Sequence, residues 1–334
     1  MRTFGVIAGS VAALSVPSLI RAQSRFDTPH GTVEVLGLRR WTVGMIQDSA
    51  AKYAPGNDLA SHACAAILRS KLGFADASVV VYPSATDSAK ALYIVTVIEP
   101  QDSAVVRYKP PYSDSLPERS DWQLVIDVFQ AHPGDFQRAI QRPGFLTSAT
   151  LTPDEATEFS AALPVRNLVR AHGNPADFRL ALTTIARDGN SSNRLAALLL
   201  LTNFVASDSA WWSLLDAVRD PTPFVAGTAG QLLGMLVRST PRRVDWEPMA
   251  GTVRALLDGT SLFEHNVVMQ TLAATEVSPR LASRLLANSG DLVLAKLASS
   301  DPAGRDAAHR LLVQLSGHDL GFAPDQWRRW IAGL

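Results

Sequence analysis

The sequence changes its pattern near the middle, and this change restricts the folds that the chain can adopt. Residues 24–110 predict one strand, two helices and then two further strands. From about residue 166 to the end, amphipathic helical patterns follow one another, separated by short turns and Asp-Pro steps. A mixed segment followed by helices alone is typical of two modules of different class. We therefore expect an α+β N-terminal domain followed by an all-α domain.

Length and composition agree with a two-module globular protein. The chain has 334 residues, of which 47% are hydrophobic and 19% charged, and its formal net charge is zero. This length exceeds that of one typical domain, and the composition is that of a folded protein. Proteins that bind nucleic acid usually carry a strongly basic surface, and the neutral balance argues against that role. We expect no nucleic-acid partner.

The N-terminus has the features of an export signal. Arg2 provides a positive charge, and an apolar stretch from Phe4 to Ile20 precedes Arg21-Ala22-Gln23. We predict a signal peptide over residues 1–22, with cleavage after Ala22. An uncleaved membrane anchor is the alternative, because the stretch approaches the roughly 17 residues that span a bilayer. We expect an exported protein, periplasmic or extracellular, with no later membrane-spanning segment.

The N-terminal module has elements in the order β-α-α-β-β. The strands are expected at 32–38, 77–82 and 92–99, and the helices at about 43–54 and 59–72. Thr42 can cap the first helix, and Pro55-Gly56 ends it, because proline cannot continue a helix. Cys64 falls on the apolar face of the second helix. We interpret it as a small core residue.

Short motifs in residues 24–110 resemble those of a polypeptide-transport-associated (POTRA) domain. They are Val33-Glu34-Val35-Leu36-Gly37, Pro55-Gly56, Leu72-Gly73-Phe74 and Val97-Ile98-Glu99. The resemblance implies a small three-stranded sheet whose exposed edge pairs with an extended segment of another chain. POTRA domains usually occur in series before a membrane partner, whereas this chain has one copy. A generic α+β domain without strand addition is the alternative.

Residues 111–170 predict a linker followed by short helices. Pro110-Pro111 ends the first module, and residues 113–120 are polar with a further proline. Short helices are expected at 122–131, 135–142 and 153–163. Thr152-Pro153-Asp154-Glu155 indicates a helix start, because proline suits the first turn and acidic side chains favour the positive end of the helix dipole.

Residues 171–334 predict helices in consecutive pairs. The expected pairs are 176–187 with 191–205, 209–219 with 223–238, 247–258 with 262–276, and 279–298 (broken near Gly290) with 303–316. Asp220-Pro221 and Asp301-Pro302 each indicate a helix start, 81 positions apart (301 − 220). This spacing is close to two repeats of about 40 residues.

The paired helices and the C-terminal sequence are similar to those of HEAT-repeat proteins. Gly317-His318-Asp319-Leu320-Gly321 precedes Trp327 and Trp330, which share a helix face and are expected to cover the last repeat. The resemblance covers about half of the chain. It implies an armadillo-like helical solenoid that binds proteins or peptides along a concave surface.

No motif for catalysis or metal binding stands out in the sequence. Seven histidines are scattered without metal-ligand spacing, and no nucleophile elbow, phosphate-binding loop or dinucleotide fingerprint occurs. We expect no metal, no cofactor and no enzymatic activity. The candidate partner-binding residues are aromatic, as interface anchors often are: Trp211, Trp212, Tyr108 and Tyr112. Only one of the adjacent tryptophans can face the core fully, and simple packing on the sheet is the alternative for the tyrosines.

The sequence therefore predicts an exported, non-enzymatic scaffold or adaptor of the cell envelope. Its partners would be proteins or peptides, recognised by a strand edge and by a helical-repeat groove. An enzyme or small-ligand-binding protein with a pocket in the helical array is one alternative. A purely structural envelope protein that self-assembles is another.

Overall fold

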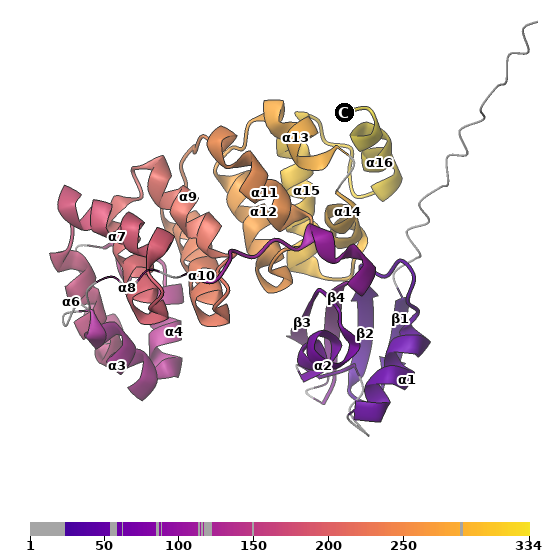
Figure 1. Ribbon diagram of the computed structural model, residues 1–334, viewed down its shortest axis with the longest axis horizontal. Coiled ribbons are helices and arrows are strands. Elements are labelled where there is room, and N and C mark those ends of the chain that lie inside the picture. Colours follow the sequence, from indigo (N-terminus) through magenta and orange to yellow (C-terminus); the bar gives the residue numbers. More distant parts are fainter. Residues whose placement is uncertain are drawn as a thin grey trace, which may run out of the picture.

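The computed structural model describes residues 24–53, 59–61, 63–84, 87, 89–112, 114, 116, 122–148, 150–287 and 290–334. A four-stranded sheet is followed by a curved row of helices (Figure 1). The predicted class, an α+β N-terminal region followed by a helical region, is confirmed. The predicted signal peptide at residues 1–22 and the Pro55-Gly56 turn lie outside the described residues.

The sheet module, residues 24–98, contains four strands and two helices. They are β1 (Ser24–Thr28), β2 (Gly31–Leu36), α1 (Val43–Tyr53), α2 (Ala63–Leu72), β3 (Asp76–Pro83) and β4 (Ala91–Ile98). The strand order is β1-β2-β4-β3, with β2 parallel to β4 and the other two pairings antiparallel. The parallel pair requires a crossover connection, which α1, α2 and β3 supply.

The two faces of the sheet pack against different partners, because successive side chains of a strand point to opposite sides. One face packs on α1 and α2 through an apolar core, in which Cys64 is buried as predicted. Representative members of this core are Val33, Val35, Ile46, Leu68, Val79, Val95 and Val97. The opposite face carries buried polar residues, among them Glu34, Ser78 and Thr96. That face meets the helices of the C-terminal half of the chain (Figure 1).

The expected three-stranded sheet is wrong, because β1 adds a fourth strand. β1 pairs with β2 from Ser24↔Val35 to Thr28↔Gly31. The tight turn between them is held by the Thr28 hydroxyl, which donates to the carbonyl of Gly31 at 3.0 Å. Phe26 is the one large apolar side chain of β1, so the strand has almost no alternating pattern to reveal it. As a result, the edge of β2 is already paired within the chain.

The helical array, residues 123–332, begins with short helices and continues with longer ones. The first half contains α3 (Gln123–Ala131), α4 (Pro133–Gln141), α5 (Pro153–Glu158), η2 (Ser160–Ala162), α6 (Leu163–Ala171), α7 (Pro175–Arg187), α8 (Ser191–Leu201), η3 (Thr202–Phe204), α9 (Asp208–Ala217) and α10 (Pro223–Ser239). The second half contains η4 (Glu247–Met249), α11 (Ala250–Leu257), η5 (Leu262–Glu264), α12 (His265–Ala274), η6 (Pro279–Leu281), α13 (Ala282–Leu286), α14 (Asp291–Ala298), α15 (Pro302–Ser316) and α16 (Pro324–Ala332). Between the sheet module and the array lies η1 (Pro100–Val105). No helix in the described part of the chain is long and apolar enough to cross a membrane.

The array follows the predicted helix pairs closely. The pairs α7/α8, α9/α10 and α11/α12 lie where the sequence pattern places them, and α13, α14 and α15 account for the last one. The predicted start at Thr152 has a complete capping box with Glu155. The two Asp-Pro steps differ, however. Asp301 caps α15 by accepting from the Gly304 amide at 2.9 Å, whereas Asp220 precedes α10, whose N-cap is Thr222.

The C-terminal helix covers the end of the array as expected. In α16, Trp327 is completely buried, and its Nε1–H donates to the Gly321 carbonyl at 2.7 Å. Trp330 packs edge-on against it, with ring centroids 5.8 Å apart. The two indoles thus close one apolar core that extends through the array.

Candidate functional site

The sheet module is docked on the array by residues that are far apart in the sequence. The Tyr82 hydroxyl donates to Asp301 Oδ1 at 2.5 Å, and the Ser300 amide donates to Glu34 Oε2 at 2.9 Å. Beside these bonds lies a small apolar cluster of Ile98, Leu262 and Leu292. Polar and apolar contacts together fix where the sheet lies along the array.

A buried ion pair supports this docking. Lys296 and Asp301 are 1% and 0% exposed, and the Lys296 Nζ lies 3.5 Å from the Asp301 carboxylate. Burial lowers the pKa of Lys296, with the Asp301 carboxylate opposing the effect. Burial alone would raise the pKa of Asp301, but the Lys296 ammonium and the Tyr82 hydroxyl lower it. Burial, and then the Lys296 charge, lower the pKa of His265 to about 4, so this histidine is neutral near pH 7.

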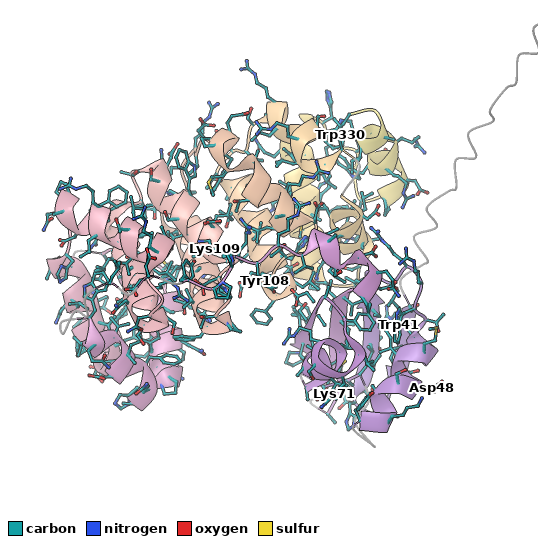
Figure 2. All side chains as sticks on the ribbon, in the orientation of Figure 1. Trp41, Asp48, Lys71, Tyr108, Lys109 and Trp330 are labelled. Atoms are coloured by element: carbon teal, nitrogen blue, oxygen red, sulfur yellow. The ribbon has the colours of Figure 1, made fainter. Side chains whose placement is uncertain are left out.

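Residues 99–112, here named the connector, run along the array instead of hanging free (Figures 1 and 2). The Lys109 amide donates to the Arg219 carbonyl at 2.9 Å, and its ammonium lies 2.6 Å from Asp216. Farther on, the Tyr112 ring lies 4.3 Å from the guanidinium of Arg194. At least the first residues of the predicted linker at 111–120 are therefore packed on the helices.

The four aromatic residues proposed from the sequence do not form one surface. Trp211 is 0% exposed, and its Nε1–H donates to the Val205 carbonyl at 2.9 Å, so it is a core residue and not a partner contact. Trp212 is half-buried, as expected for the second of two adjacent tryptophans. Tyr112 packs on the array. Tyr108 bonds the sheet module, its hydroxyl donating to Asp76 Oδ2 at 2.9 Å.

The described surface has a cleft of about 630 Å³ between the sheet module and the array. β3 and α2 form one wall, and η5 and the start of α10 form the other. Of the residues proposed from the sequence, Tyr108 lines this cleft, and Figure 2 shows it where the connector passes from the sheet to the array. The side chains that matter for its chemistry are Arg69, Asp76, Tyr108, Phe263 and Glu264.

An unpaired stretch of the β3 edge begins in the cleft, at Val79. The Ala77 amide donates to Asp76 Oδ1 at 2.8 Å, and the Ala77 carbonyl accepts from Arg69 at 2.6 Å, so the backbone groups of Ala77 point away from β4. In an antiparallel strand every second residue does the same, so the amide and carbonyl of Val79 and Val81 also point outward. Within the described chain, these groups have no hydrogen-bond partner. Only this short stretch of the β3 edge is available for pairing.

Glu264 is the unusual acidic residue of the cleft, and no motif in the sequence marks it. Its side chain is buried, with 7% exposed, and within the described chain it forms no hydrogen bond or ion pair. Burial raises its pKa to about 8. The sequence feature that relates to this position is the pair Gly227 and Gly230 in α10. These glycines leave room for a side chain beside one face of the helix.

A second cavity of about 620 Å³ also lies between the sheet module and the array. It is bounded by the end of β2, by η1 and by α11, α14 and α16. Most of its charged side chains pair with one another: Arg39 with Asp291 at 2.8 Å, Arg254 with Asp258 at 3.6 Å, and Arg328 with Asp325 at 2.5 Å. The remaining wall is mostly aliphatic.

Comparisons with known proteins give no independent indication of function. No protein family, no curated protein and no solved structure matches the chain. Among the described residues, no group of three or more His, Cys, Asp and Glu side chains is placed to hold a metal ion. The function has to be inferred from the geometry of the two cavities.

Proposed function

We propose that this protein is an exported, non-enzymatic adaptor that binds an extended segment of a protein partner in the cleft between sheet and array. The observation that carries the proposal is the unpaired β3 edge at Val79, which opens into the cleft. An added strand would gain main-chain hydrogen bonds from this edge. The POTRA-like and HEAT-like sequence features support the same role, because both architectures bind other chains.

The structure changes how strand addition would work in this protein. The resemblance implied an exposed edge on a three-stranded sheet, but β1 occupies the edge of β2. The β3 edge, in contrast, is bordered by Arg69 of α2 and by Phe263 of η5. A bound segment would therefore contact the sheet through its backbone and the helical array through its side chains.

Photo-crosslinking tests this proposal in the full exported chain. A photoreactive residue replaces Phe263, which is 66% exposed in the cleft, or Met45, which is 47% exposed on α1. We expect adducts with a partner segment from position 263 and none from position 45. Equal labelling from both positions, or no adduct from well-expressed protein, would contradict the proposal.

A substitution that removes one backbone amide of β3 tests whether the partner segment binds to the strand edge. Val81→Pro removes an amide that points away from β4, so the pairing of β3 with β4 is kept. Val81→Thr is the matched control, because it changes the side chain and keeps the amide. We expect the adduct to disappear in Val81→Pro and to persist in Val81→Thr.

The second cavity favours one alternative function, the binding of a small apolar ligand. Its aliphatic wall and internally paired charges suit such a ligand better than an ionic one. Ala298→Trp would fill the cavity from an exposed position of α14. A fragment that raises the melting temperature of the wild type but not of Ala298→Trp would support this alternative.

A further inference from the structure

Glu264 is held in the cleft by a turn of the array that is bonded by the connector and by the sheet module. Gly259 and Ser261 have positive φ values of +123° and 60°, and Ser261 is a residue that rarely adopts this conformation. Thr260 between them accepts a hydrogen bond from the Arg107 amide at 2.9 Å, and the following Leu262 amide donates to Asp76 at 3.0 Å. Backbone strain that is held in this way is common at functional sites.

The array makes room for the carboxyl group of Glu264 but gives it no partner. A Cβ atom built on Gly230 of α10 would lie 1.8 Å from Glu264 Oε2, and one on Gly227 would lie 3.8 Å from Oε1. The carboxyl group therefore lies directly against α10. Any larger residue at position 230 would displace it.

The other charged groups of the cleft already have partners of opposite charge. Arg69 lies 3.6 Å from Asp76, and Asp220 lies 2.8 Å from Arg194. The Tyr108 hydroxyl donates to Asp76 as well. Glu264 is the remaining carboxylate among the described residues that line the cleft. Because its pKa is about 8, it is mostly protonated at pH 7, and a nearby cation would ionise it.

Two aromatic rings line the same cleft as Glu264 and are exposed at its surface. Phe263 is 66% exposed and Tyr108 is 41% exposed. Exposed rings of this kind can pack on the aliphatic part of a long basic side chain and attract its charge. The cleft thus combines an unpaired acid with apolar contacts at its entrance.

We propose that the segment bound in the cleft presents a lysine or arginine side chain, whose charge pairs with Glu264 and whose aliphatic stem packs on Phe263. The inference rests on the proposed binding of an extended segment, and it defines the kind of segment. On binding near pH 7, the Glu264 carboxyl group releases its proton to the buffer, and the carboxylate remains as the counter-ion of the basic group.

A displayed library of random heptapeptides, selected on the full chain at pH 7, tests the inference. We expect lysine or arginine to be enriched at one position of the peptides that bind wild-type protein. Glu264→Gln should lose this enrichment, whereas Glu276→Gln, at an exposed glutamate, should keep it. Circular dichroism confirms that both variants are folded.

The possible results separate this inference from the proposed function. Peptides that bind through Val81 but show no basic preference would overturn the inference and leave the adaptor function intact. Basic enrichment that persists in Glu264→Gln would also overturn it. If no peptide is enriched, both proposals fail.

Calorimetry of the best selected peptide measures the charge pair directly. Replacing its basic residue by an uncharged analogue of similar shape, citrulline for arginine or acetyl-lysine for lysine, should weaken binding about 10- to 100-fold, as expected for a buried charge-assisted contact. In Glu264→Gln, the same replacement in the peptide should weaken binding only about threefold or less. The binding heat of the wild type should also depend on the ionisation heat of the buffer. Heat that is independent of the buffer at pH 7 would contradict the proton release.

Discussion

The unpaired carboxyl group of Glu264 makes a quantitative prediction about stability and pH. In the unfolded chain a glutamate has a pKa near 4.5, whereas burial raises that of Glu264 to about 8 in the folded protein. Between these values the folded chain keeps a proton that the unfolded chain has lost. The wild type should therefore lose stability as the pH rises from about 4.5 to 8, relative to Glu264→Gln, which has no such proton.

The size of the effect follows from the two pKa values. One pKa unit corresponds to about 1.4 kcal/mol, so the interval from 4.5 to about 8 amounts to at most about 4–5 kcal/mol. Urea unfolding of wild type and Glu264→Gln between pH 5 and pH 9 measures this difference. Glu158→Gln, on the exposed surface of α5, is the matched control. A difference between wild type and Glu264→Gln that changes by less than about 0.5 kcal/mol over this range would refute the reasoning.

Substitutions at three further sites and their controls test how the sheet module is held on the array and how α16 covers its end. Asp301→Ala should destabilise the chain by about 3–5 kcal/mol in urea unfolding, because it removes the ion-pair partner of the buried Lys296 ammonium, and Asp301→Asn should cost less. Gly259→Ala should cost about 1–3 kcal/mol, because its Cβ would lie 2.5 Å from Ile98 Cδ1 at a φ of +123°; faster amide exchange in β4 would report a loosened sheet. Trp327→Ala should cost about 3–5 kcal/mol by calorimetry, whereas the half-buried Trp330→Ala should cost less.

The helical part of the fold was predictable because its signals are local. Helix starts such as Thr152-Pro153 and the periodic apolar positions of α8 and α10 depend on residues within a few turns of one another. The same local information correctly predicted three of the four strands. β1 was not predicted, because a five-residue strand with one large apolar side chain has almost no alternation of apolar and polar residues.

The candidate site was not predictable for the opposite reason. The bond between Tyr82 and Asp301 joins residues 219 positions apart, and the bond between Leu262 and Asp76 joins residues 186 apart. No periodicity records such a contact. Glu264 is likewise unremarkable in the sequence, because its burial depends on how the sheet module meets α10.

The location of the unpaired sheet edge supports a site that accepts particular segments of other chains. It does not support a sheet that pairs with any extended segment. The outer strand β1 carries Arg25 and Asp27 as exposed side chains, and charged residues on edge strands discourage unspecific pairing. At the other edge, Arg69 and Asp76 already bond the backbone of Ala77. Pro83, which has no amide proton, ends β3. Only the stretch around Val79 remains, and there the cleft walls decide which side chains can accompany an added strand.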